Sequence, residues 1–120
     1  MKATDTIENS EDLIDSRDVI ERIAFLQREV ESGDNDCSEE LESLLDLEKE
    51  AEGYAPDWRH GATLIRRSYF VKYCQEMLED CGDIPKDLPH YIRIDWQATA
   101  DEIGMDYTDV DFDGVTYLVR

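Results

Sequence analysis

The chain has 120 residues, of which 31 are Asp or Glu and 12 are Lys or Arg, so its formal net charge is −19. This length is enough for one domain, or for one small domain with an extension. The negative charge disfavours direct binding to nucleic acids and to anionic membranes, because both are polyanions. It favours a basic partner, such as a protein that itself binds nucleic acid.

The cysteines and the N-terminus indicate the cellular compartment. An odd number of cysteines, at positions 37, 74 and 81, fits a reducing cytosol better than a disulfide framework. The first residues contain no apolar segment of the signal-peptide type. No apolar run approaches the roughly 18 residues of a membrane span. We therefore expect a cytoplasmic protein with no membrane contact.

The first half of the chain predicts an acidic helical hairpin. Residues 1–13 are polar and are expected to be frayed. One helix is expected to open at Asp15-Ser16 and to stop at Gly33, and a second to run from Ser38 to Gly53. Apolar residues recur at helical spacing in both segments. The short turn between them predicts an antiparallel pair.

Negative charge is concentrated in this half. Residues 1–53 carry 18 Asp and Glu against five Lys and Arg, whereas residues 54–120 carry 13 against seven. A charge run is ordinarily a solvated helix face, but such a face tends to mix signs, for a few tenths of a kcal/mol per pair. The repetition of one sign on the second helix therefore argues that the negative field has a use. The repeating residues are Glu39, Glu42, Asp46 and Glu50.

The second half begins with an ambiguous segment. Residues 61–67 predict either a short buried strand or the lead into the next helix. An aromatic-rich helix with a broad apolar face is expected from Ser68 to Gly82. Asp95 is a good N-cap for a short helix that stops at Gly104.

The clearest signal in the sequence is a β-hairpin near the C-terminus. Residues 110–117 place an Asp-Gly pair between alternating apolar residues, and a two-residue turn needs positive φ at both positions. In that register Phe112 faces Val115, and Val110 faces Tyr117. Because an isolated hairpin is marginal in water, this one is expected to pack on the upstream helices.

These elements predict an α+β fold. An acidic helical hairpin, residues 1–53, precedes a unit of residues 54–120 that contains the aromatic-rich helix, the short helix and the antiparallel hairpin. The two parts are an extension and a domain, or one continuous domain.

Candidate metal sites in the sequence are weak. The segment Asp109–Gly114 matches the start of an EF-hand calcium loop, but Arg120 stands where the loop needs a bidentate Glu. Cys74 and Cys81 share a helix face without the usual zinc-ligand spacing, which favours small buried hydrophobes. We therefore expect no metal.

Catalytic motifs are also missing from the sequence. The chain has two histidines, no Gly-rich phosphate loop and no nucleophile motif. Carboxylates are so abundant that no particular pair can be nominated for acid–base work. We expect a protein that is not an enzyme and that uses no cofactor.

Several segments of the second half share a pattern of aromatic, acidic and turn residues. They are Ser68–Tyr73, Gly82–Pro85, Ile94–Ala100, Met105–Thr108 and Phe112–Tyr117. In this pattern the chain resembles the C-terminal part of the ArdA-like antirestriction proteins of plasmids and phages. It also looks like the short acidic proteins of phages and prophages.

The resemblance implies a DNA mimic that acts in the cytoplasm of a host cell. Such a protein displays carboxylates where DNA presents phosphates, and it occupies the DNA-binding site of a restriction–modification enzyme or a CRISPR effector. Members of the family are longer and dimerise, so this chain would cover a comparable length only as a homodimer. The carboxylates expected to bind the basic partner are Glu39, Glu42, Asp46, Glu50, Asp101, Glu102, Asp109, Asp111 and Asp113.

The alternative is a small acidic adaptor or regulatory module. It would bind a host protein through an apolar groove, and its acidity would serve only solubility. Salt separates the two hypotheses, because binding by a mimic weakens steeply with ionic strength whereas binding in an apolar groove does not.

Overall fold

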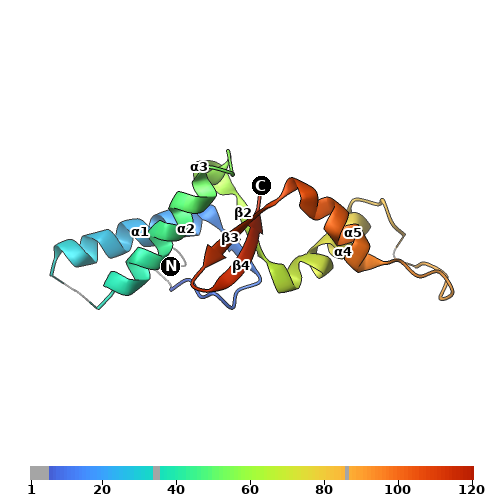
Figure 1. The fold of residues 1–120 in the computed structure, drawn as a ribbon, viewed down its shortest axis with the longest axis horizontal. Coiled ribbons are helices and arrows are strands. Elements are labelled where there is room, and N and C mark those ends of the chain that lie inside the picture. Colours follow the sequence, from blue (N-terminus) through green and yellow to red (C-terminus); the bar gives the residue numbers. More distant parts are fainter. Residues whose placement is uncertain (1–5, 34–35, 86) are drawn as a thin grey trace.

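A four-stranded antiparallel sheet forms the middle of the molecule, and helices extend from it in both directions (Figure 1). The computed structural model describes residues 6–33, 36–85 and 87–120. The expected α+β class is confirmed. In chain order the elements are β1 (Leu13–Asp15), α1 (Ser16–Glu31), α2 (Ser38–Glu52), α3 (Trp58–Gly61), β2 (Thr63–Arg66), the 3₁₀ turn η2 (Arg67–Tyr69), α4 (Phe70–Asp80), α5 (Trp96–Ile103), the 3₁₀ turn η3 (Gly104–Asp106), β3 (Thr108–Phe112) and β4 (Val115–Val119).

The strands lie in the order β1-β2-β4-β3, and each neighbouring pair is antiparallel. The register predicted for the hairpin is confirmed, because Phe112 pairs with Val115 and Val110 pairs with Tyr117. The two turn residues have φ of 52° and 86°, the left-handed conformation that this turn requires. Of the two alternatives for residues 61–67, the strand is correct, since β2 lies between β1 and β4.

The expectation that residues 1–13 are frayed is wrong for the part of this segment that the structure describes. Leu13–Asp15 forms strand β1, which pairs with β2 at the edge of the sheet. The hydroxyl of Tyr117 donates a hydrogen bond to the carbonyl of Glu11 at 2.5 Å. A polar segment can be ordered in this way because its backbone groups find partners in the sheet. Residues 1–5 lie outside the described residues.

Helices α1 and α5 each begin directly after an Asp residue that caps them. Asp15 and Asp95 accept hydrogen bonds from backbone N–H groups in the first turns of α1 and α5, at 2.9 and 3.0 Å. The helix expected from Ser68 begins later, at Phe70, because a 3₁₀ turn precedes it. Among the described residues, no helix is both long and apolar enough to cross a membrane.

The two faces of the sheet carry separate hydrophobic clusters. One face packs on α1, α2 and α3, and the other packs on α4 and α5 at the opposite end. The molecule is therefore elongated, 62 × 27 × 24 Å, and its radius of gyration is 17.1 Å against about 14 Å for a compact domain of this length. The first cluster includes Leu26, Leu44, Trp58, Leu64, Phe112 and Tyr117, and the second consists of Ile65, Phe70, Cys74, Ala100 and Leu118.

The two cysteines expected to share a buried helix face differ in exposure. Cys74 is buried, and burial raises the pKa of its thiol. The expectation is wrong for Cys81, which is exposed. Cys81 follows the last residue of α4, and Gly82, with φ of 79°, turns the chain away from the apolar face.

Ser16 joins the start of α1 to the segment before β2. Its side chain is fully buried, and its Oγ donates a hydrogen bond to the carbonyl of Trp58 at 2.6 Å. The same Oγ accepts a hydrogen bond from the N–H of Ala62 at 2.7 Å. One hydroxyl thus satisfies two buried backbone groups that lie far from it in sequence.

We expect Ser16→Ala to lower the free energy of unfolding by about 1–3 kcal/mol, because it leaves buried backbone groups without a partner. Urea denaturation followed by circular dichroism measures the change. Ser10→Ala is the matched control, since Ser10 is exposed and its loss costs at most about 0.5 kcal/mol. Equal losses in the two variants would contradict the role of Ser16.

Ionisation of Tyr117 makes the stability of the fold depend on pH in the alkaline range. Burial raises the pKa of Tyr117 from 10.0 to about 12, because the phenolate would lose its hydration. The raised pKa stabilises the folded state fully below about pH 10, and this contribution is lost as the pH rises through about 12. Tyrosine absorbance should therefore show a titration step near pH 12. A step that persists in Tyr117→Phe would show that it belongs to another residue.

Candidate functional site

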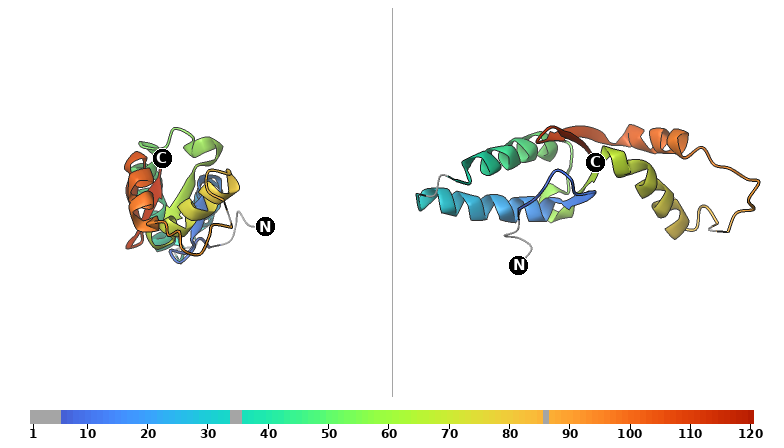
Figure 2. Two further views of the ribbon diagram at one scale, coloured as in Figure 1. Left: turned by 90° about the vertical axis from the view of Figure 1, so that its right-hand side faces the viewer. Right: turned by 90° about the horizontal axis from the view of Figure 1, so that it is seen from below.

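Three acidic elements lie along one long side of the molecule. Figure 2 shows α2, the β3–β4 hairpin and α5 following one another along this side, whereas α1 and α4 lie along the other. We define the acidic side by residues 38–52, 96–103 and 108–119. It contains all nine carboxylates expected to bind a partner, and each is exposed: Glu39, Glu42, Asp46, Glu50, Asp101, Glu102, Asp109, Asp111 and Asp113.

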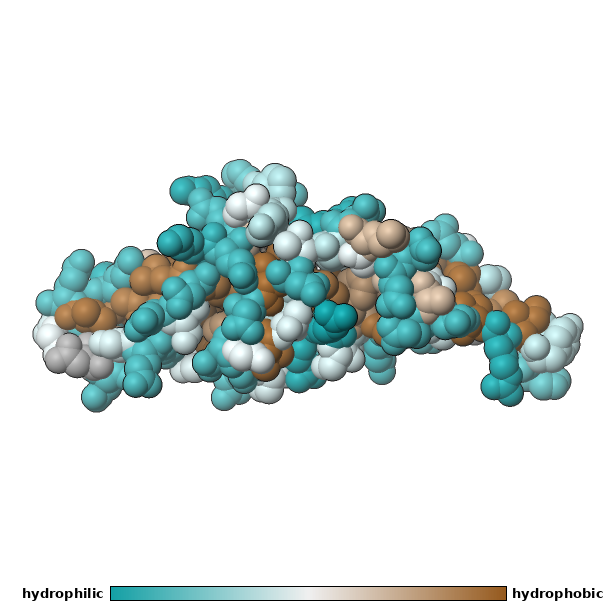
Figure 3. Space-filling model, in the orientation of Figure 1, coloured by the Kyte–Doolittle hydropathy of each residue, from teal (hydrophilic) through white to brown (hydrophobic). Residues whose placement is uncertain are grey.

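The two long sides differ in charge. The elements of the acidic side carry 12 Asp and Glu and one Lys, whereas α1 and α4 carry seven Asp and Glu and four Lys and Arg. None of the described Asp and Glu residues is buried, because an isolated carboxylate loses its hydration in the core. Figure 3 shows a largely hydrophilic surface, with apolar residues visible between the polar ones.

Helix α2 carries the first row of carboxylates on its exposed face. The apolar residues Leu44, Leu47 and Ala51 are buried on a different face of the helix, which fixes its rotation. A helix rises about 1.5 Å per residue, so the row extends over about 16.5 Å with about 5.5 Å between successive charges. The row consists of Glu39, Glu42, Asp46 and Glu50.

Strand β3 and its turn carry the second row, at alternate positions. Because β3 is an edge strand, its outward N–H groups have no strand partner in the described part of the chain. The Oε1 atom of Glu50 accepts a hydrogen bond from the N–H of Asp111 at 2.7 Å. Helix α2 thus covers part of the sheet edge, and this bond places the two rows beside each other.

The N-terminal end of α2 also lies close to the hairpin turn. Glu39 and Asp113 line one groove of about 430 Å³, together with Glu40 and Phe112. The buried Arg22 of α1 binds Glu40, with Nε 2.6 Å from Oε2, which holds the two helices together. The structure therefore brings six of the nine expected residues into one continuous surface formed by α2 and the hairpin.

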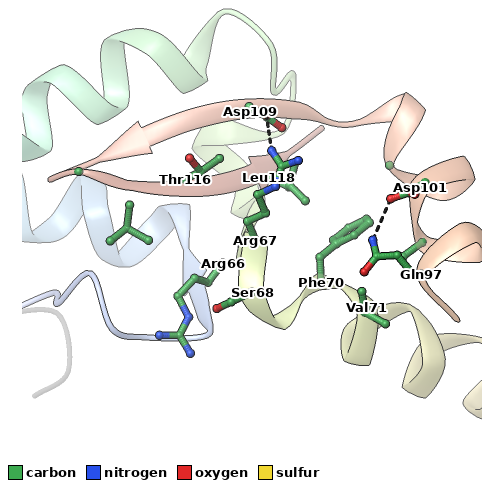
Figure 4. Close-up of a pocket in the computed structure, with 14 residues that line it drawn as sticks. Arg66, Arg67, Ser68, Phe70, Val71, Gln97, Asp101, Asp109, Thr116 and Leu118 are labelled. Atoms are coloured by element: carbon green, nitrogen blue, oxygen red, sulfur yellow. Dashed lines mark hydrogen bonds and ion pairs between the residues drawn. The ribbon is translucent and has the colours of Figure 1, made fainter.

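The other three expected residues lie nearer to α5. Asp101 and Glu102 are exposed on α5, and Asp101 lines a second groove with Asp109 (Figure 4). Arg67 binds Asp109, with Nη1 3.0 Å from Oδ2. The charge of Asp109 is thus compensated within the chain, so this residue is less suited than the others to attract a basic partner.

Sequence reasoning did not single out the second groove. It has a volume of about 760 Å³ and lies between η2, α5 and the uncovered part of the sheet. One signal was present, because Arg66 and Arg67 are the only adjacent pair of Lys or Arg residues in a chain of net charge −19. The lining also includes Ser68, Phe70, Val71, Gln97, Ala100, Thr116 and Leu118.

No cluster of three or more His, Cys, Asp and Glu side chains in the described part of the chain is placed to hold a metal ion. The segment that resembles a calcium loop, Asp109–Gly114, forms strand and turn of the hairpin. No family model, curated protein or solved structure matches the chain. The functional interpretation therefore depends on the charge and geometry of the acidic side.

We expect Glu50→Ala to accelerate hydrogen exchange of the Asp111 amide by about 3- to 10-fold, because the amide loses its acceptor. Exchange measured by NMR tests this. Asp46→Ala, one turn earlier in the same row, removes the same charge and should leave the rate unchanged. Similar acceleration in both variants would show that charge, and not the hydrogen bond, controls the exchange.

Proposed function

We propose that the protein is a non-enzymatic anti-defence protein of a phage or mobile element. In this proposal its acidic side mimics DNA and blocks the DNA-binding site of a host restriction–modification enzyme or CRISPR effector. The observation that supports it most is the placement of carboxylates along one long side of an elongated molecule. The resemblance to ArdA-like proteins points to the same class of target.

The amount of charge is suited to this role. Duplex DNA carries one charge per about 1.7 Å, so a length of 62 Å corresponds to about 36 phosphates. The net charge of the protein is −19, about half of that value. The acidic side holds 12 of the 31 carboxylates and a single Lys, so its net charge is −11.

The expected energetics follow from the same comparison. Lys and Arg residues in a DNA-binding channel would exchange phosphates for carboxylates, and the long-range field would accelerate association. A protein that makes about 6–10 contacts with DNA phosphates loses about 10³- to 10⁵-fold in affinity for DNA between about 50 and 200 mM salt. A mimic should show a steep salt dependence of the same kind, and duplex DNA should compete with it.

We expect the combined change Glu39→Lys, Glu42→Lys and Asp46→Lys to weaken inhibition by about 100-fold or more, because each Lys faces a basic channel with like charge. Glu50 stays unchanged because it binds the hairpin backbone. The target is first captured from host lysate on the immobilised protein and released with salt. Inhibition is then measured as cleavage of labelled duplex DNA by the purified target.

The matched control is Glu21→Lys, Glu29→Lys and Glu31→Lys on α1, which changes the net charge equally on the opposite side. It should retain most of the inhibition. An equal loss of inhibition in both triple variants would show that net charge alone, and not the position of the carboxylates, causes the loss. Full inhibition by the α2 variant, or binding that is insensitive to salt and to DNA, would contradict mimicry.

A further inference from the structure

The second groove exists because α4 and α5 cover only part of their face of the sheet. They bury Ile65 and Leu118, which point toward these helices. The neighbouring Thr116 is only half-buried, and the hairpin turn beyond it is open. The result is a trough that extends from the turn of the hairpin to the end of α5 (Figure 4).

The floor of the trough is apolar. Phe70, Ala100 and Leu118 belong to the second hydrophobic cluster, and Val71 adjoins them. Gly104, directly after α5, lies over this floor, where a Cβ atom would be in van der Waals contact with Phe70, 3.4 Å from its Cε2. The volume of about 760 Å³ falls in the range of about 300–1,000 Å³ that is typical of ligand sites.

The rim of the trough contains one uncompensated charge. Arg67 forms an ion pair with Asp109. Arg66 forms an ion pair with Asp12, which does not line the groove. Asp101 accepts a hydrogen bond from Nε2 of the neutral Gln97 at 2.9 Å, and forms no ion pair within the described residues. A single negative charge beside an apolar floor is complementary to a cation carried on an apolar stem.

We propose that this groove binds an extended segment of a partner protein, with an Arg or Lys side chain at Asp101 and an adjacent apolar side chain on Phe70 and Leu118. Arg and Lys stems lie on apolar surface while their charged ends stay in water, which suits this geometry. The net charge of −19 disfavours a phosphate or a nucleic acid in the same place. The inference goes beyond DNA mimicry, because the groove can bind such a segment whatever the rest of the surface does.

The test is an NMR titration of the full chain with the capped dipeptide acetyl-Arg-Phe-amide. Saturable shift changes are expected in the methyl groups of Val71, Ala100 and Leu118. The capped dipeptide acetyl-Glu-Phe-amide keeps the aromatic group and reverses the charge, so it should bind more weakly than acetyl-Arg-Phe-amide. This experiment uses no DNA-binding enzyme, so its failure is distinct from failure of the mimicry proposal.

Two pairs of variants locate the binding. Asp101→Asn should weaken binding of acetyl-Arg-Phe-amide by about three- to fivefold, as expected for an exposed ion pair. Glu102→Gln changes the neighbouring residue, which does not line the groove, and should leave the binding unchanged. Thr116→Trp fills the trough and should abolish binding. Its control, Thr63→Trp, places the same side chain at an exposed strand position outside the groove.

The outcomes are decisive in either direction. The proposal is supported if Thr116→Trp abolishes binding and Thr63→Trp does not, and if Asp101→Asn weakens binding and Glu102→Gln does not. Shift changes scattered over the acidic side, with equal weakening in Asp101→Asn and Glu102→Gln, would show that the dipeptide senses charge alone. The absence of any saturable change with the unsubstituted chain would also overturn it.

Discussion

Each face of the sheet carries a hydrophobic cluster, and a different group of helices packs on each. In β2 the adjacent residues Leu64 and Ile65 are both buried, one in each hydrophobic cluster. Tyr117 and Leu118 divide in the same way on β4. The second cluster has only five buried residues, so α4 and α5 depend on the sheet that joins them to the larger first cluster. The opposite placement of the two helix groups explains the elongated shape, and the groove is open because α4 and α5 cover only part of their face.

Repulsion between carboxylates opposes the folded state. At physiological salt the Debye length is about 8 Å, so charges at the two ends of a 62 Å molecule barely interact. Within the α2 row the spacing is about 5.5 Å, and the repulsion there is only weakly screened. Burial of Leu44, Leu47 and Ala51 on the same helix offsets it. The ion pair between the buried Arg22 and the half-buried Glu40 adds a direct link between α1 and α2.

Local features of the fold could be read from the sequence, and non-local ones could not. The caps at Asp15 and Asp95 and the Asp-Gly turn act within a few residues, so they left a clear pattern. Strand β1 has three residues, too few for a visible alternation, and its order comes from a partner far along the chain. Exposure of the nine carboxylates followed from helix and strand periodicity. Their gathering on one side, and the groove behind Arg67, depend on how the helices pack across the sheet.

The distribution of charge separates the two interpretations of the acidic composition. Solubility needs net charge but no particular placement, and spreading carboxylates evenly would reduce their repulsion. Here α1 and α4 mix acidic and basic residues, whereas the acidic side has a single Lys among 12 carboxylates. The bond from Glu50 to the edge of β3 then fixes two like-charged rows beside each other. The placement of such rows together, at an electrostatic cost, supports the proposed basic partner over solubility alone.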